Sequence, residues 1–366
     1  MSAEAGIRPL RADDLERVAE LFVATFRAGG RASRSAVVDY MRAVYLDGPT
    51  FDPEVPSLVA ENAEGRVGAF IGVTRASLAS DDQRLRAAIS TNFMVEPGSG
   101  PLTATRLLSA FLAGKQDLSL TDTATDTSAR IWEVSGGIRC PAYSLSFTRA
   151  LRPAAFAAHR FAQRDRVAGT VAATRLAARP LDFVLRRLPL EPFRLPQAGA
   201  RTADLDLPSV ASSMGRVSRL SLCPSYEPAW LGFVLEQAAR KQGGTLVGRT
   251  VEGAGSSLAG WYLYYPNPGS VAEVLQLIAR PQSFGTVFDA LLTDAVDAGA
   301  VVLRGRAHPS QLNALTERRC SLACDNWLLV HSRHAEVEQA FLQGRALLTG
   351  LDTEHWMRFI GDPFED

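Results

Sequence analysis

Residues 92–112 read Asn92-Phe-Met-Val-Glu-Pro-Gly-Ser-Gly-Pro-Leu-Thr-Ala-Thr-Arg-Leu-Leu-Ser-Ala-Phe-Leu112. This pattern predicts a short apolar strand, a Pro/Gly turn, and a helix with apolar residues at positions 107, 108, 111 and 112. A strand that enters a glycine-containing turn at the start of a helix leaves several backbone N–H groups unpaired, and the helix dipole there favours an anion. The segment therefore predicts a cradle for a phosphate group.

The composition is typical of a soluble globular protein that is long enough for two domains. The chain has 366 residues, of which 46% are hydrophobic, and its 39 basic residues balance 39 acidic ones. No apolar run reaches the roughly 18 residues that suggest a membrane span, and the first residues lack the pattern of a secretory signal. We therefore expect a cytoplasmic protein without a membrane span. The four cysteines show no metal-binding spacing, and we expect no metal site.

The first half has the element order of a mixed α/β domain. A strand that carries Asp122 at its end follows the helix of residues 92–112. The expected elements are, in order, a strand at 7–10, a helix at 15–26, a β-hairpin at 57–62 and 66–75, and strands at about 85–95, 118–121 and 144–149.

The segment 92–112 resembles the pyrophosphate-binding segment of the GNAT (GCN5-related N-acetyltransferase) superfamily, V-x-P-x-x-R/Q-G-x-G-x-G/A-x-x-L. Val95 and Pro97 match this pattern. Gly100, Pro101, Thr103 and Thr105 occupy the positions of Arg/Gln, Gly, Gly and Gly/Ala. The resemblance implies a donor-binding site that comprises Val95, Pro97, Gly98, Gly100, Thr103 and Thr105.

The resemblance also implies catalytic residues. A backbone N–H of the strand polarises the donor carbonyl in this family, and Val95 would supply it. Asn92 lies on the same strand and would order the amine or a water if a bulge turns it the same way. Residues 127–137 align with the family's N-x-x-A-x-x-L-Y-E-K-x-G-F helix, with matches at Ala129 and Gly137. Glu133 stands where the family often has the tyrosine that protonates the thiolate of coenzyme A.

The second half repeats the first. Residues 245–265 repeat the strand–turn–strand pattern of 57–74, and residues 275–292 repeat the segment 92–112, with Pro281 matching Pro97. We therefore predict an α/β protein with two tandem GNAT-like domains, at 1–150 and 198–366. Bulky residues crowd the second loop, so we expect no coenzyme A there. We expect the chain to end in a helix at 335–347 and a strand at 351–359.

The segment that joins the halves, residues 151–197, is rich in arginine. Residues 149–194 contain ten Arg, no Lys and three acidic residues, a local charge of +7. One interpretation is an amphipathic linker helix whose arginines are solvated or paired with surface acids. The other is an arm that binds phosphates of tRNA, because the planar guanidinium binds phosphate bidentately. The candidate residues are Arg160, Arg164, Arg175, Arg179, Arg186 and Arg187.

These features leave three functions open. The resemblance implies an N-acyltransferase that moves an acyl group from acyl-coenzyme A, as co-substrate and not as tightly bound cofactor, to a small-molecule amine. Aminoacyl-tRNA is the alternative donor, as in the Fem-type transferases, whose two half-domains this arrangement resembles; its leaving group is a hydroxyl, so no tyrosine acid is needed. The third interpretation is a non-catalytic pseudo-acyltransferase that binds a ligand. The Arg- and Ala-rich composition resembles biosynthetic enzymes of GC-rich bacteria.

Overall fold

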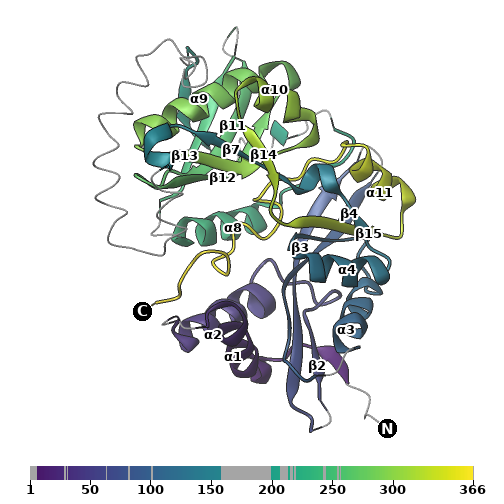
Figure 1. Cartoon of the computed structure of the whole chain (residues 1–366). Helices are drawn as coiled ribbons and strands as arrows, with labels where there is room; N and C mark the ends of the chain where they lie inside the picture. The colour runs from purple at the N-terminus through teal and green to yellow at the C-terminus, as the bar shows by residue number, and fades with distance from the viewer. Residues whose placement is uncertain are drawn as a thin grey trace. The chain divides into compact units, whose positions relative to one another are not determined.

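The structure is a computed structural model that describes residues 6–28, 30, 32–62, 64–80, 83–99, 102–157, 199–206, 213–214, 217, 220–241, 245–253, 255 and 257–365. The chain forms two compact units (Figure 1). Unit 1 comprises Met1–Ser144, Leu220–Gly244 and Asn326–Asp366, and unit 2 comprises Leu145–Arg219 and Thr245–Asp325. Neither unit is one continuous half of the chain, so the predicted boundaries at 150 and 198 do not coincide with the units.

Unit 1 contains a mixed sheet with the strand order β1-β2-β3-β4-β5-β15-β6, and β9 (Cys223–Pro224) pairs with β3. Only the contact between β4 and β5 is parallel in this order. The strands are β1 (Ile7–Pro9), β2 (Leu58–Glu61), β3 (Val67–Ala79), β4 (Arg84–Val95), β5 (Leu118–Ala124), β15 (Trp327–Ser332) and β6 (Ile138–Arg139).

Helices cover both faces of this sheet. In Figure 1, α1 (Leu15–Phe26) and α2 (Arg34–Arg42) lie on one side of β3 and β4, and α3 (Thr103–Leu112) and α4 (Asp126–Val134) lie on the other. The apolar side chains predicted for α3, at 107, 108, 111 and 112, are all buried in one core with strand residues such as Ile71 and Val73. Unit 1 also contains α8 (Pro228–Arg240) and α11 (Ala335–Leu342).

Unit 2 repeats this arrangement with the strand order β8-β10-β11-β12-β13-β7-β14. Its helix α9 (Phe284–Asp297) packs on the sheet through buried residues that include Val287, Phe288 and Leu291, and a short helix α10 (Leu312–Glu317) follows. The strands are β8 (Thr202–Asp204), β10 (Val247–Glu252), β11 (Leu258–Tyr265), β12 (Val271–Ala279), β13 (Val302–Arg306), β7 (Leu145–Ala150) and β14 (Ser321–Cys324). The predicted two-fold repeat of one α/β unit is confirmed.

The two sheets exchange one strand each. The strand predicted at 144–149 to close the first domain is β7, but it pairs with β13 and β14 in unit 2. Conversely, β15 from the second half of the chain lies between β5 and β6 in unit 1. Phe147 of β7 is fully buried against Phe288, with ring centroids 5.5 Å apart. The prediction placed β7 in the wrong sheet because alternating burial shows that a strand exists but not which strands pair with it.

The C-terminal segment also differs from the prediction. Residues 350–361 form consecutive turns and not the expected strand at 351–359. The segment is nevertheless buried, since Leu351 and Trp356 are fully enclosed, and Phe359 packs on Tyr40 and Tyr45 with centroids 4.7 and 5.7 Å apart. The apolar residues of this segment are buried, but their pattern did not distinguish a strand from turns. Among the described residues, no helix is long and apolar enough to cross a membrane.

Gly72 on β3 leaves room for a buried tyrosine. A Cβ atom at this position would lie 2.5 Å from the hydroxyl oxygen of Tyr45 and 2.6 Å from Oγ1 of Thr91. These two hydroxyl groups are 2.7 Å apart and hydrogen-bonded to each other. Only glycine at position 72 therefore lets the hydroxyl groups of Tyr45 and Thr91 pack directly against the β3 backbone.

We predict that Gly72→Ala lowers the free energy of unfolding by about 2 kcal/mol, because the added methyl group overpacks this site. Gly232→Ala is the control: nothing lies within 4 Å of a Cβ there, and removing a glycine from the interior of α8 should stabilise by up to about 1 kcal/mol. Denaturant unfolding measures both. If the added methyl group clashes with the Tyr45 hydroxyl, Tyr45→Phe combined with Gly72→Ala should restore part of the lost free energy of unfolding. Equal stability of the two alanine variants would contradict the prediction.

Candidate functional site

Strands β4 and β5 separate part-way along unit 1. Their parallel pairing covers only Ala87 with Leu118, Ala88 with Ser119, and Ile89 with Leu120. Beyond Ile89, β4 stays paired with β3 as far as Val95, while β5 stays paired with β15 as far as Ala124. The sheet therefore opens between β4 and β5 beyond Ile89 and Leu120.

A β-bulge at Asn92 shapes the β4 side of this opening. The pairing of β3 with β4 changes register between Phe70 and Gly72, opposite Asn92, and Asn92 has a left-handed backbone with φ of 46°. Its side-chain amide donates to the Tyr45 hydroxyl at 2.9 Å. Burial raises the pKa of Tyr45, which therefore keeps its proton. The sequence left open whether a bulge occurs here; one is present, and the Asn92 amide is bound to Tyr45.

The backbone of Val95 faces the opening. Val95 lies opposite Ala69, and the next residue, Glu96, donates its N–H to the Gly68 carbonyl at 2.8 Å. In an antiparallel ladder, hydrogen-bonded and non-hydrogen-bonded pairs alternate, so Val95 belongs to a non-hydrogen-bonded pair and its N–H points away from β3. On that side β5 has already diverged. The Val95 N–H therefore has no ladder partner among the described residues, and its role as a donor to the acyl carbonyl stays a prediction.

The turn before α3 provides a second part of the predicted donor site. Gly98, after Pro97, has φ of 93° and nothing within 4 Å of a Cβ atom. The Thr103 hydroxyl donates to the Ser99 carbonyl, and Thr105 lies partly buried on the first turn of α3. The Glu96 carboxylate is paired with Arg17 at 2.6 Å and Arg66 at 3.4 Å, so its charge is compensated. Gly100 and Pro101 lie outside the described residues.

In unit 2, a side chain lies against the start of the helix that follows the corresponding turn. A Cβ atom on Gly285, in the first turn of α9, would lie 2.4 Å from a guanidinium nitrogen of Arg318. Arg318 is held there by Asp289, with nitrogen–oxygen distances of 2.7 and 3.1 Å. When Pro281 is aligned with Pro97, Gly285 corresponds to Pro101, which lies outside the described residues. That the second copy binds no coenzyme A stays a prediction.

A histidine–carboxylate pair lies on the β5 side of the opening. Asp122 is 2% exposed, and its Oδ2 accepts from the Thr353 hydroxyl at 2.8 Å and lies 3.0 Å from His355 Nε2. Ile89 pairs with Leu120, and Thr91 and Asp122 each lie two residues further on. Their side chains therefore project from the same face of the sheet. The Asp122–His355 pair shares this face with Tyr45 and Thr91.

Glu354, in the C-terminal turns, places a second buried carboxylate against β5. It is 4% exposed, and its Oε1 accepts from the Thr123 hydroxyl at 2.5 Å. The sequence interpretation missed Glu354 and His355 because it assigned their segment to a strand. The polar run Asp352-Thr-Glu-His355, between the apolar Leu351 and Trp356, was the signal that could have indicated them.

The remaining predicted residues lie elsewhere. Glu133 is on α4, where both carboxylate oxygens accept from the Arg139 guanidinium at 2.8 and 2.9 Å. Arg139 in turn lies over the ring of Trp327, so Glu133 is engaged in a surface pair. The six arginines proposed for tRNA, at 160, 164, 175, 179, 186 and 187, lie outside the described residues, so that role stays a prediction. No group of three potential metal ligands occurs among the residues that the structure describes.

By sequence, the chain matches no protein-family model and no curated protein. By structure, it is similar to a GCN5-related N-acetyltransferase from Anabaena variabilis, with a TM-score of 0.58 at 10% identity over 90% of this chain and 73% of that one. The chain has the GNAT fold. A probable N-acyltransferase from Enterococcus faecalis has a TM-score of 0.56 at 10% identity, over 93% of this chain and 74% of that one. A GCN5-related N-acetyltransferase from Kribbella flavida has a TM-score of 0.53 at 11% identity, over 91% of this chain and 72% of that one. The GNAT fold predicted from residues 92–112 is confirmed, and the likeness to Fem-type transferases stays a prediction.

We predict that Asn92→Val destabilises the protein by about 2 kcal/mol more than Asn92→Gly does. A β-branched residue is disfavoured in the left-handed region, whereas glycine adopts it freely and loses only the hydrogen bond to Tyr45. Denaturant unfolding of both variants provides the measurement. Asn267 of unit 2 has φ of 40°, so Asn267→Val controls for a left-handed site away from the opening. Equal stability of the two Asn92 variants would refute the bulge as a constraint.

Proposed function

We propose that the protein is an N-acyltransferase that moves an acyl group from a coenzyme A thioester to the amine of a small molecule, at the opening between β4 and β5 of unit 1. The observation that carries the proposal is the Val95 N–H, which faces this opening a few residues before the start of α3. The names of the structural neighbours, N-acetyltransferase and probable N-acyltransferase, agree with this class of reaction.

The donor would bind through its pyrophosphate near Gly98 and the start of α3. Unpaired N–H groups at the start of α3 favour an anion, and the positive φ of Gly98 lets the backbone approach it closely. The acyl carbonyl would then lie in the opening, where the Val95 N–H can donate to its oxygen. Such a donor stabilises the negative charge that develops as the amine attacks.

His355 is our candidate for the base. The amine nitrogen attacks the carbonyl carbon, the carbon–sulfur bond breaks, and the amine proton must be taken up. Asp122 lies beside Nε2 of His355, which leaves Nδ1 for the substrate; no hydrogen bond to Nδ1 is found within the described part of the chain, and the side chain is 31% exposed. A buried carboxylate that orients the ring and stabilises its protonated form is a recurring arrangement for a general base. The imidazolium can then protonate the departing thiolate, so no tyrosine acid is required.

Replacing Val95 by proline tests the donor geometry. The substitution removes an N–H that is not used in the β3 ladder, so we expect the sheet to be retained and acyl transfer to fall by about 100-fold or more. Ala279→Pro is a matched control, because Ala279 also precedes a residue, Arg280, whose N–H donates back to the neighbouring strand. Release of free thiol from acetyl-coenzyme A, with a panel of amines, measures the reaction.

Ala279→Pro should keep full activity, and both variants should keep the thermal stabilisation that coenzyme A gives to the unsubstituted protein. Two results would overturn the proposal. One is activity in Val95→Pro that equals that of Ala279→Pro. The other is the absence of both thiol release and stabilisation by millimolar coenzyme A in the unsubstituted protein.

For His355, we predict that His355→Gln lowers the transfer rate by about 100-fold, because a glutamine side chain cannot take up the amine proton. His334, with Nε2 3.6 Å from Asp117 Oδ1, also pairs with an aspartate, so His334→Gln should keep the rate of the unsubstituted enzyme. Release of free thiol from acetyl-coenzyme A measures both variants. An unchanged rate in His355→Gln would exclude His355 as the base.

A further inference from the structure

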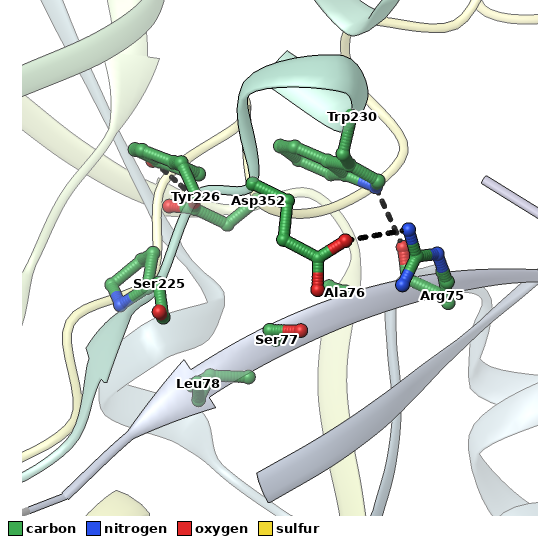
Figure 2. A pocket seen from close by; sticks show the side chains of 10 residues that line it. Arg75, Ala76, Ser77, Leu78, Ser225, Tyr226, Trp230 and Asp352 are labelled. Atoms are coloured by element: carbon green, nitrogen blue, oxygen red, sulfur yellow. Dashed lines mark hydrogen bonds and ion pairs between the residues drawn. The ribbon is translucent and has the colours of Figure 1, made fainter. Parts of the chain in front are cut away.

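A hollow that is partly open to solvent lies in unit 1. Figure 2 shows Arg75, Ala76, Ser77 and Leu78 of β3 along one side of it, and Tyr226 and Trp230 on the other. Asp352, from the C-terminal turns, completes the lining together with Pro224, Ser225 and Glu227. All of these residues belong to one compact unit.

Two aromatic rings form one wall of the hollow. Tyr226 and Trp230 are stacked, with centroids 5.7 Å apart and planes 6° from parallel. The indole N–H of Trp230 donates to the Arg75 carbonyl at 2.8 Å, which fixes the orientation of its ring (Figure 2). Electron-rich ring faces held in a fixed position attract cations, most strongly where water is excluded.

The two carboxylates of the hollow differ in how their charge is compensated. Glu227 is paired with Arg75 at 2.8 Å and lies 3.6 Å from Arg84. Asp352 is 4% exposed and accepts hydrogen bonds from neutral donors: the Thr349 N–H at 2.8 Å, the Thr349 hydroxyl at 2.6 Å and the Tyr226 hydroxyl at 2.5 Å. Among the described residues, no Arg, Lys or His forms an ion pair with Asp352. A buried carboxylate without a cationic partner is costly, and a bound cation would remove that cost.

We propose that this hollow binds the cationic group of a small organic molecule, an ammonium or a guanidinium, against the Tyr226–Trp230 stack and the Asp352 carboxylate. The combination selects a positive charge attached to an organic group. The stacked rings provide apolar contact and attraction by their faces, and Asp352 provides the uncompensated negative charge. The proposal concerns binding alone, so it does not depend on the acyl-transfer reaction.

The protonation of Asp352 gives this binding a pH dependence. The pKa of Asp352 is raised to about 6: burial raises it most, the hydrogen bonds from Thr349 and Tyr226 lower it, and the negative charge of Asp122 raises it. Glu227 and Arg75, paired with each other, are the other charged groups in the lining. A bound cation favours the ionised carboxylate, so binding should release a proton near pH 6 and should strengthen as the pH rises through this value.

Calorimetric titration with benzylammonium, and with benzyl alcohol as its neutral counterpart, tests the proposal on the full chain. Above pH 6, benzylammonium should bind at least tenfold more tightly than the alcohol. From one pH unit above the Asp352 pKa of about 6 to one unit below it, the ammonium should lose about tenfold in affinity, because the ionised fraction falls by that factor. Titration in buffers of different ionisation enthalpy measures the released proton.

Asp352→Asn should abolish the preference for the ammonium and the proton release. Glu236→Gln removes an exposed carboxylate of α8 that is paired with Arg240, and it should change neither. If Asp352→Asn does not fold, the proton release of the unsubstituted protein still decides the matter. Equal affinity for the ammonium and the alcohol, binding without proton release near pH 6, or unchanged binding in a folded Asp352→Asn would each overturn the proposal.

Discussion

The left-handed backbone of Asn92 is the constraint on which the functional half of this protein depends. A strand of twelve residues would normally pair with both neighbours along its length, and β4 does so only as far as Ile89. At Asn92 the bulge changes the direction of the chain, and the hydrogen bonds of Tyr45 to Asn92 and Thr91 hold it there. Gly72 leaves the space that this tyrosine needs. One glycine on β3 thus supports the separation of β4 from β5.

The two units share a feature of one strand and differ in the charges at the helix that follows it. Both have a bulge in the strand before the turn, at Asn92 in β4 and next to Gln276 in β12. In unit 2 the Arg318 guanidinium lies against Gly285 at the start of α9 and is neutralised by Asp289. In unit 1 the residue before the turn, Glu96, is the charged group that is compensated, by Arg17 and Arg66.

Local features of this protein could be predicted from its sequence, and long-range ones could not. The hairpin of β2 and β3 and the apolar face of α3 depend on neighbouring residues, and both are present. The partners of β7 and β15 depend on pairing across most of the chain, which no local pattern encodes. The Asp122–His355 pair was not predicted, for the same reason. It joins residues that are far apart in sequence, and His355 lies in turns whose composition resembles that of a strand.

The exchange of β7 and β15 has a consequence for how the chain must be made. In unit 1, Ser119 pairs with His331, so the sheet around β5 is incomplete until more than two hundred further residues have left the ribosome. Pairing at such separation costs loop-closure entropy and slows folding. Until then the edge of β5 is exposed, and edges of this kind invite pairing with other chains. Synthesis of this protein therefore includes an interval in which the β5 edge of its first unit has not yet met its partner strand β15.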